Sequence, residues 1–362
     1  MNKFVRAAQT SHSLSLAAME EASREGLRAA DIEHMFLALV IDAQPAGHAL
    51  RSLGIDLDSA RRAVKEQHDA QLASLGIEAS FPEAGRIVFH ETDGYQWSPR
   101  ALDVIAKSSR HGNTGDAAAV LRALVAEPSG LINDILARLD TTSEAVIERL
   151  NQHDPFVEKS APGGGKSVPG GGIGVPTGGK SAPGGGIGVP TGASVKMRIV
   201  GSSETFVPGP LNEVWVFLAD PTHVPMWDPS IGNIDSTSQD AMPGSVWEGS
   251  VWEGAAPTTH PNGKPMRIKS QFRRRSIELV AAHRPDRITW NFGYPDVARS
   301  NPVLTEFSLA ATTGGTHVRI SKSRPRRQGW RGLITVPLRP IQKFLMWIAV
   351  SQTASAISRA FR

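Results

Sequence analysis

Hydrophobic positions in the first 150 residues recur with the period of amphipathic helices. Between residues 17 and 39 the apolar side chains lie three or four positions apart, with one short polar interruption. Gly26 in this interruption is the expected end of one helix, and Asp31 is the expected cap of the next. A further apolar window covers 46–53 and ends at Gly54. No window alternates with the two-residue period of a strand, so this part is predicted to be all-α.

The order of these predicted helices occurs twice. The first set extends from residue 4 to about residue 64, and the second extends from Trp97 to Leu150. A loop over roughly 66–96 is expected to join the two sets. Two consecutive sets of similar helices predict a bundle that is built from two repeats.

Beyond residue 196 the hydrophobic period changes. Residues 197–206 alternate as a strand does, and residues 210–218 form a short amphipathic helix with proline in its first turn. A long helix is predicted from about Leu338. The pattern predicts an α+β domain with an antiparallel sheet and a long C-terminal helix. The remaining predicted strands, joined mostly by short turns, cover 231–237, 245–253, 266–279, 286–292, 303–311 and 317–323.

A repetitive segment separates the two parts. The sequence KSVPGGGIGVPTGG is followed directly by KSAPGGGIGVPTGA, and glycine and proline dominate both copies. Such a segment has too little apolar surface to offset the entropy lost on ordering. We therefore predict a flexible linker at 156–195 between two domains, which cover 1–155 and 196–362.

The net formal charge of +4 conceals an asymmetry. Residues 1–158 carry a charge balance of −8, and residues 196–362 carry +9. Opposite charges would attract the two domains weakly, because salt screens exposed charges beyond about 8–10 Å. The chain has no cysteine and lacks a secretory apolar stretch near residue 1, so a cytoplasmic location is expected. Nucleic acid has only charge in its favour, and no nucleic-acid partner is predicted.

Three segments of the helical part carry a family resemblance. They are Ile32-Glu33-His34-Met-Phe-Leu-Ala-Leu39, Leu53-Gly-Ile-Asp56 and Trp97-Ser-Pro-Arg-Ala101. With these segments the chain resembles the Clp N-terminal (Clp repeat) domain of Clp-family AAA+ chaperones, over nearly all of residues 1–150. The resemblance implies an all-α bundle of two repeats that recognises substrates and adaptors.

The same resemblance suggests where peptides would bind. In the family an aromatic residue near the start of each repeat lines the peptide surface, and by position these residues are Phe4 and Trp97. Some members bind phosphorylated arginine through a glutamate of each repeat. Glu33 is present, whereas the second repeat has Ala118 and Ala119. Phe4, Glu33 and Trp97 are therefore the peptide-binding candidates, and His34 is expected to have a packed, hydrogen-bonded structural role.

The second part carries its own resemblance. A strand is followed by Pro210-Leu-Asn-Glu-Val-Trp215 on a helix and then by Trp227-Asp-Pro229. With the predicted order of elements, this resembles the SRPBCC superfamily of START-like and polyketide cyclase-like proteins. The resemblance covers about 196–362 and implies a helix-grip fold, in which a curved sheet wraps the last helix around an apolar cavity. The candidate lining residues are Trp227, Trp247, Phe272, Trp290, Phe307, Phe344 and Ile348.

No motif predicts catalysis. The histidines include no HExxH pair, and no serine stands in a nucleophile elbow. We therefore predict no metal, no cofactor and no catalytic residue. Cyclase members of the superfamily orient ketones with polar residues inside the cavity. Glu306 and Arg319 on predicted strands are the polar residues considered for this role, although no spacing singles them out.

The favoured interpretation is a non-ATPase adaptor or sensor, since residues 196–362 lack the ATPase motifs that follow a Clp N-terminal domain. It would recognise a peptide or protein client and would also bind a hydrophobic small molecule or lipid. The Clp protease machinery is one candidate protein partner. One alternative is a polyketide cyclase/aromatase-like enzyme. Another is lipid binding or transfer at a membrane, which Arg324, Arg326 and Arg327 favour, although a solvated strand edge explains them as well.

Overall fold

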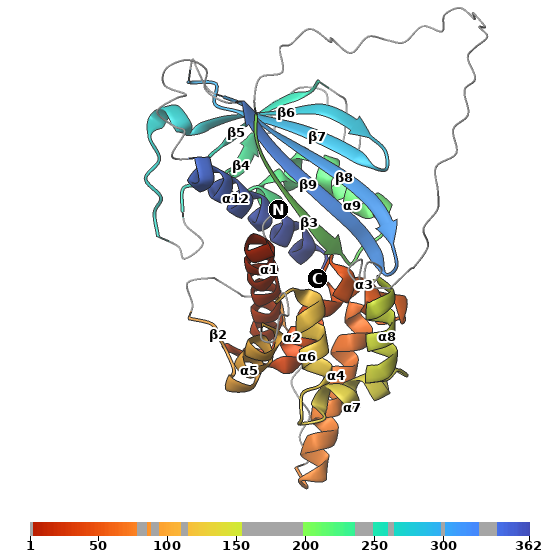
Figure 1. Cartoon of the computed structure of the whole chain (residues 1–362). Helices are drawn as coiled ribbons and strands as arrows, with labels where there is room; N and C mark the ends of the chain where they lie inside the picture. Colours follow the sequence, from red (N-terminus) through yellow and green to blue (C-terminus); the bar gives the residue numbers. More distant parts are fainter. Residues whose placement is uncertain are drawn as a thin grey trace, which may run out of the picture.

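The structure is a computed structural model of the chain (Figure 1). The side chains of residues 3–10, 153 and 339–343 are outside the description. The predicted domain boundaries near 155 and 195 fall in the undescribed range 154–197 and stay predictions. The structure describes residues 3–77, 85–87, 94–109, 115–153, 198–235, 249–259, 264–297, 301–325 and 339–362.

The described residues up to His153 form a helical bundle, the helical half. Helix α2 is its centre, because all nine of its residues are buried. Asp31 caps this helix, and its Oδ1 accepts a hydrogen bond from the backbone of Ile32 at 2.8 Å. The helices are α1 (Lys3–Arg24), α2 (Ile32–Val40), α3 (Pro45–Ser52), α4 (Leu57–Ser74), α5 (Pro99–Ser108), α6 (Ala117–Val125), α7 (Leu131–Arg138) and α8 (Ser143–His153).

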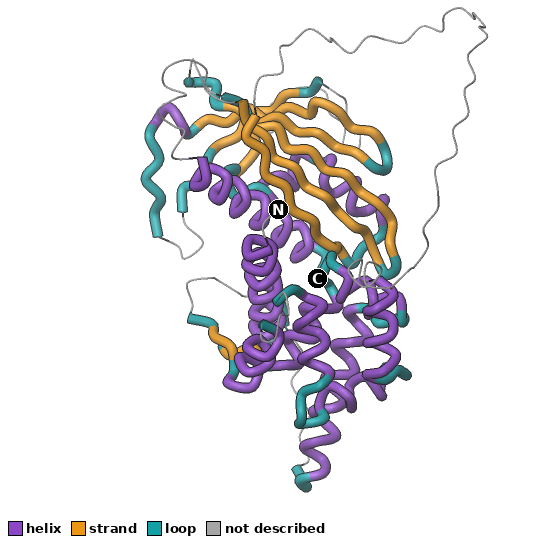
Figure 2. The backbone as a smooth tube through the Cα atoms, in the orientation of Figure 1, coloured by secondary structure: helices purple, strands orange, loops and turns teal. Residues whose placement is uncertain are grey.

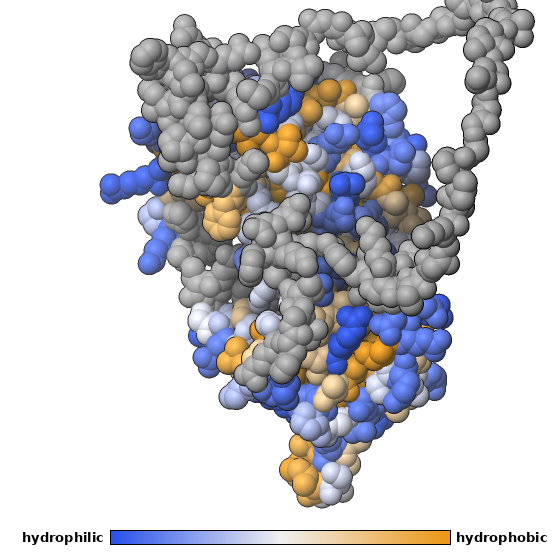
Figure 3. Space-filling view, viewed as in Figure 1, coloured by the Kyte–Doolittle hydropathy of each residue, from blue (hydrophilic) through white to orange (hydrophobic). Residues whose placement is uncertain are grey.

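Two features of the helical half differ from the sequence prediction. A short parallel pair joins β1 (Ala29–Ala30) to β2 (Gln96–Trp97), so the half is not purely helical. Two-residue strands are too short to show a period, which is why the pattern missed them. Helix α4 continues to Ser74 instead of ending near Val64. Leu75 and Ile77, which follow α4, are exposed. Figure 3 shows apolar surface at the end of the molecule where α4 ends.

The second part, the sheet half, consists of helices and a large antiparallel sheet, as expected of an α+β helix-grip fold. The strand order is β3-β9-β8-β7-β6-β5-β4, and the sheet curves around α12 (Figure 2). Its elements are β3 (Arg198–Val207), α9 (Leu211–Ala219), the 3-10 turn η1 (Pro221–His223), α10 (Val224–Trp227), β4 (Asn233–Asp235), β5 (Val251–Ala255), the 3-10 turn η2 (Ser270–Phe272), β6 (Arg274–His283), β7 (Arg287–Gly293), β8 (Val303–Thr312), β9 (Gly315–Pro325) and α12 (Arg339–Ala360).

The predicted strand at 266–279 was wrong at its start. Strand β6 begins at Arg274, and the turn η2 precedes it. Helix α12 approaches the sheet closely at Gly201 of β3, where a Cβ atom would lie 2.7 Å from Met346 Cγ. Glycine at this position therefore allows the helix to lie against the strand.

The two halves are in contact. Phe206 of β3 is 2% exposed and packs with the hydrophobic cluster of the helical half. The guanidinium carbon of Arg51 on α3 lies 3.8 Å from the centre of the Phe206 ring. Beside this contact lies a cleft of about 480 Å³ between α1, β3 and α12. Among the described residues, no helix has the length and apolar character needed to cross a bilayer.

Candidate functional site

The candidate site lies on the inner face of the sheet. Alternate residues of β9 point inward, and Val318, Ile320 and Lys322 are all buried. On β8 the same face carries Thr305 and Phe307, which are also buried. A lysine and a threonine thus stand in rows that are otherwise apolar, where burial of an unpaired polar group is costly.

The strand register places these two side chains next to each other. Thr305 is the direct partner of Lys322 on β9, and on its other side it faces Trp290 of β7. Direct partners on one face of an antiparallel pair have Cβ atoms about 5 Å apart. Thr305 therefore stands between a cation and an indole ring on the concave face of the sheet.

Asp228 supplies the counter-charge. Helix α10 ends at Trp227, and the next residue turns its carboxylate toward β9. Lys322 Nζ lies 3.0 Å from Asp228 Oδ2, and the two side chains are 6% and 7% exposed. Ser230 donates from its hydroxyl to Asp228 Oδ1 at 2.7 Å and from its backbone at 3.0 Å. Ser230 itself is exposed, so the group reaches the protein surface.

The ionised form of Asp228 is favoured despite its burial. Burial alone would raise the pKa of this carboxyl group, but the charge of Lys322 and the hydrogen bonds from Ser230 and Lys322 lower it below its usual value. A buried ion pair contributes little net stability, because removing both charges from water costs about as much as their attraction returns. The pair therefore calls for an explanation other than stability.

Several buried donors in this region have no acceptor. Trp227 Nε1 and Thr305 Oγ1 are buried and have no hydrogen-bond partner in the described part of the chain. The Trp227 ring lies 6.4 Å from the Trp290 ring and 5.1 Å from the Phe307 ring, centre to centre. Since these two rings flank Thr305 on the sheet, the two unpaired donors belong to one region.

A second cation borders the same loop. Arg275 of β6 is 8% exposed, and its Nε donates to the carbonyl oxygen of Ser230 at 3.1 Å. Its guanidinium lies over the Tyr294 ring, 4.2 Å from the ring centre. One nitrogen of the group, NH1, is buried without a partner among the described residues.

Together these residues form what we call the polar cluster: Trp227, Asp228, Arg275, Thr305 and Lys322. Within the described residues it contains two cations and one carboxylate, and it has more donors than acceptors. Such a cluster suits an oxygen acceptor, and an anionic oxygen above all, because hydrogen bonds to charged groups are the stronger ones.

The aromatic candidates of the sequence fall into two groups. Trp227, Trp290 and Phe307 are fully buried and contact one another beside the polar cluster. Trp252 points inward, with its ring 5.7 Å from that of Trp290. Trp247 lies outside the described residues.

The other three candidates lie outside this aromatic core. Phe272 is half-buried in η2 and contacts Tyr294. Phe344 is 58% exposed and lies against Trp347, whereas Ile348 is half-buried on α12. The helical pattern identified the apolar side of α12 but not how far its first turns extend beyond the sheet.

Glu306 and Arg319 do not lie inside the sheet. Both occupy outward positions, where Glu306 pairs with Arg287 and Arg319 pairs with Glu204 at the surface. The inward neighbours one position away, Thr305 and Lys322 paired across β8 and β9, carry the polar groups instead. Strand parity would have found Lys322, since it follows Val318 and Ile320 at the two-residue period.

The structure brings two of the three peptide-binding candidates to one place. Trp97 is half-buried and pairs through its backbone with Ala30, close to Glu33 at the start of α2. Burial raises the pKa of Glu33, against the charge of His34, and its Oε2 is buried without a hydrogen bond from the described residues. Phe4 lies on α1, and its side chain is outside the description.

His34 has the structural role that the sequence indicated. Its ring is fully buried, with Nδ1 accepting from the backbone of Asp31 at 3.1 Å and Nε2 lying 3.3 Å from Glu25. Asp31 also accepts from Ser98 and Arg100, which ties α2 to the start of α5. The described residues contain no group of acidic or histidine side chains arranged to hold a metal ion.

Comparison with known proteins gives matches in structure only. No protein-family profile matches the chain, and no curated protein sequence is detectably similar. Solved structures of polyketide cyclase-like proteins are among the matches. The Polyketide_cyc-like protein Cgl2372 from Corynebacterium glutamicum is 16% identical with a TM-score of 0.31, and covers 45% of this chain and 91% of its own.

Two further matches have the same character. Protein CV1439 from Chromobacterium violaceum is 16% identical with a TM-score of 0.29, over 44% of this chain and 97% of its own. The di-domain ARO/CYC StfQ of the steffimycin biosynthetic pathway is 12% identical with a TM-score of 0.33, over 46% and 51%. Because these TM-scores are below 0.5, no property of those proteins is transferred to this chain, and the Clp resemblance of residues 1–155 stays a prediction.

Proposed function

We propose that the sheet half binds a largely apolar small molecule that carries a carbonyl or carboxylate oxygen at one end. The observation that supports this is the donor excess of the polar cluster, where Trp227 Nε1, Thr305 Oγ1 and Arg275 NH1 have no acceptor among the described residues. An oxygen of the ligand would satisfy donors that the fold leaves unpaired at a cost of about 1–3 kcal/mol each.

The surroundings supply the apolar part of such a site. The rings of Trp227, Trp290 and Phe307 present aromatic surface next to the polar cluster. Ligand sites generally combine apolar walls with a few polar groups that fix orientation. The polar end of the ligand would then face Lys322, and its apolar end would lie against the rings.

We further propose that the helical half recognises a peptide, so that the chain acts as a non-ATPase sensor or adaptor. The support is local. Glu33 Oε2 is buried without a hydrogen bond from the described residues, with Arg100 at 3.9 Å, and Ala30, three residues before Glu33, pairs through its backbone with Trp97. A carboxylate and an aromatic residue on neighbouring segments suit a basic or donor-bearing side chain of a peptide.

Thr305 offers the sharpest test of the ligand site. The change Thr305→Val keeps the shape and removes a hydroxyl without a described partner, so the folded state should lose no stability. Binding of the anionic apolar probe 8-anilino-1-naphthalenesulfonate should weaken about fivefold, since one hydrogen bond contributes about 1 kcal/mol. Fluorescence titration of the full chain measures the dissociation constant.

Thr312→Val at the end of the same strand is the matched control and should leave the dissociation constant unchanged. The neutral probe N-phenyl-1-naphthylamine should bind both variants equally, because it lacks the anionic group. Equal affinity of wild type and Thr305→Val for the anionic probe would contradict the proposal. Native mass spectrometry of the protein from its own host would then identify any retained small molecule.

The Asp228–Lys322 pair supports a second candidate, a cyclase-like enzyme. A buried ammonium can polarise a ketone, and the nearby carboxylate can accept the proton from the adjacent carbon. The carbanion formed in this way would attack a second ketone of the same molecule, and the proton would return to the new alkoxide. The lowered pKa of Asp228 makes it a weak base, which is why binding is the leading proposal.

The probe 2,6-heptanedione tests this second candidate, since its ring closure gives 3-methylcyclohex-2-enone after loss of water. Activity above the uncatalysed rate that falls at least tenfold in Asp228→Asn would support catalysis. A rate equal to that of the buffer would leave binding as the function.

A further inference from the structure

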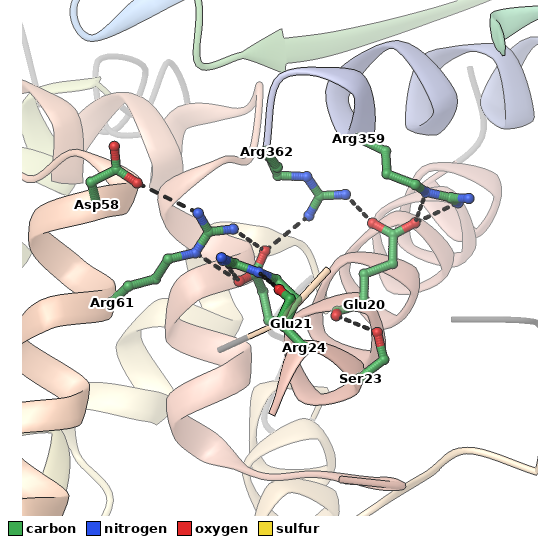
Figure 4. Close-up of polar contacts among 9 residues, drawn as sticks. Glu20, Glu21, Ser23, Arg24, Asp58, Arg61, Arg359 and Arg362 are labelled. Atoms are coloured by element: carbon green, nitrogen blue, oxygen red, sulfur yellow. Dashed lines mark hydrogen bonds and ion pairs between the residues drawn. The ribbon is translucent and has the colours of Figure 1, made fainter. Parts of the chain in front are cut away.

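Two neighbouring carboxylates of α1, Glu20 and Glu21, are buried where the two halves meet. They are 0% and 2% exposed, although they are surrounded by charge and not by apolar side chains alone. Figure 4 shows that arginines of both halves surround them. These arginines are Arg24, Arg61, Arg359 and Arg362.

The two carboxylates differ in where their partners come from. Glu21 accepts a two-pronged contact from Arg61 of its own half, at 2.9 and 2.8 Å, and Arg24 lies 3.4 Å away. Burial alone would raise the pKa of Glu21, but Arg61 first, and then Arg362 and Arg24, lower it. Glu21 is therefore largely satisfied within the helical half.

Glu20 depends on the sheet half. Its carboxylate is contacted by Arg359, whose Nε lies 2.9 Å and whose NH2 lies 2.6 Å from Oε1, and by Arg362 at Oε2. Within the described residues of the helical half, no cation pairs with it. With the sheet half in contact Glu20 is buried, and a buried carboxylate without a partner would cost several kcal/mol. The docked arrangement therefore needs the guanidinium groups that the sheet half supplies.

The spacing of the two arginines defines which kind of segment can bind to Glu20 and Glu21. Arg359 lies in the last turn of α12, and Arg362 follows in the turn after the helix, where its backbone N–H donates to the carbonyl oxygen of Arg359 at 3.3 Å. Both side chains point toward α1 (Figure 4). Arginine suits this site because its N–H groups lie on more than one nitrogen. Arg359 donates from Nε and NH2 to Glu20 Oε1, and Arg362 contacts both Glu20 and Glu21, which the single ammonium of lysine cannot reproduce.

A cleft lies beside the Glu20–Arg362 pair. The cleft of about 480 Å³ is bordered by both Glu20 and Arg362 and by serines of α12, so the pair stands at the wall of an opening. Arg362 Nε is buried and has no acceptor in the described part of the chain. Arg362 is therefore bound at the contact between the halves while its Nε–H group makes no hydrogen bond to the described residues.

We infer that Glu20 and Glu21 form an arginine-recognition site of the helical half, which the last turn of α12 and the two residues after it occupy in the same chain. Its partner in trans is a protein segment with two arginines three residues apart, the first of them in the last turn of a helix. The segment at 156–195 has the Gly/Pro-rich composition of a linker, for which about 40 residues span roughly 35 Å. An attached occupant has a millimolar effective concentration, so a free segment binds only in competition with α12. This inference does not depend on the polar cluster of the sheet half.

The experiment uses the full chain and a labelled peptide with the sequence of residues 350–362. Fluorescence anisotropy should show at least tenfold tighter binding to the Arg359→Gln/Arg362→Gln variant, whose site is vacated, than to wild type. A peptide in which both arginines are lysines keeps the charge and should bind at least tenfold more weakly. Adding Glu20→Gln to the vacated variant should abolish the gain in affinity.

Three results would overturn the inference: no binding to the vacated variant, equal binding of the lysine peptide, or binding that survives Glu20→Gln. A second measurement avoids the variants that remove charge. Because the chain has no cysteine, Ser74→Cys and Ala311→Cys, both exposed, allow donor and acceptor dyes on the two halves. Saturating arginine peptide should lower the energy transfer, and unchanged transfer would contradict the competition.

Discussion

At the scale of single residues, Lys322 and Asp228 are the clearest example of two charges that need each other. Lys322→Ala should lower the free energy of unfolding by about 3–5 kcal/mol, because it leaves Asp228 buried and unpaired. The double variant Lys322→Met/Asp228→Asn should cost clearly less, since neither charge remains. Urea denaturation of the three proteins measures these differences. A double variant as unstable as Lys322→Ala would contradict the explanation.

Asp42, which follows α2 at the cleft, makes a prediction about pH. Burial raises the pKa of this carboxyl group to about 7, against the charge of Arg51. Between about pH 4 and pH 7 the folded chain keeps a proton that the unfolded chain releases, so this residue makes stability fall as pH rises through that window. Above pH 7 the folded chain carries the buried charge.

Asp42→Asn should therefore raise the melting temperature at pH 8 by a few degrees, and should raise it less at pH 5. Differential scanning calorimetry at both values tests this. A stabilisation by Asp42→Asn that is the same at both pH values would refute the raised pKa.

The sequence predicted individual residues well where one local rule applies. Asp31 as a cap and Gly26 and Gly54 as helix ends follow from backbone geometry, and both glycines have a positive φ. The pairing of Lys322 with Asp228 could not be predicted in this way. The two residues are 94 positions apart in sequence, and only the register of the sheet and the end of α10 together bring the two charges into contact.

At the scale of elements, the contact of α12 with β3 depends on Gly201. Gly201→Ala should destabilise the chain by about 1–3 kcal/mol, because the new Cβ would lie 2.7 Å from Met346 Cγ and 3.3 Å from the helix backbone. Gly249→Ala has no neighbour within 4 Å but a positive φ, so its cost would come from the backbone alone.

Combining Gly201→Ala with Met346→Ala separates the two causes. If the clash with Met346 is responsible, the double variant should be more stable than the sum of the single effects predicts. Thermal unfolding of the four proteins gives the coupling energy. Strictly additive losses would mean that the close approach of α12 to β3 is not the cause.

Most elements were predictable from the hydrophobic period, and the exceptions have physical reasons. The order of strands and the final helix agree with the pattern, since every strand of the large sheet except β4 is long enough to alternate. The start of β6 was wrong because Met266–Phe272 has strand composition while part of it adopts the turn η2. The pair β1 and β2 depends on residues 67 positions apart, such as Ala30 and Trp97, and has no local signal.

At the scale of the whole molecule, Phe206 links the two halves. Its side chain belongs to the sheet by sequence and to the helical cluster by packing. Phe206→Ala should weaken the docking of the halves and increase the radius of gyration, because an aromatic side chain buried in this way contributes about 3–5 kcal/mol. Small-angle scattering measures the change. Phe272→Ala, far from this contact and half-buried beside Tyr294, should leave the radius unchanged.

The charge balance of the sequence anticipated attraction between the halves but not its form. The expectation was a weak, screened attraction between surfaces of opposite charge. The structure instead has a small number of buried contacts, with Glu20 and Arg362 side chains each 1% exposed. Salt screens such buried pairs much less than exposed ones. The burial of these contacts depends on how the folded surfaces of the two halves fit together. The charge pattern of the sequence does not show that fit.

Helix α12 packs against the sheet with Val350 and Ile357 and contacts the helical half through Arg359, and Arg362 just after the helix contacts that half as well. The end of the helix therefore packs against two neighbours at once, and both of them limit which substitutions it tolerates. Descendants of this chain that lose the carboxylate at Glu20 should lose the arginine at Arg359 as well, although 339 positions separate them. Correlated substitution at these two positions would indicate that the contact between the halves has been under selection.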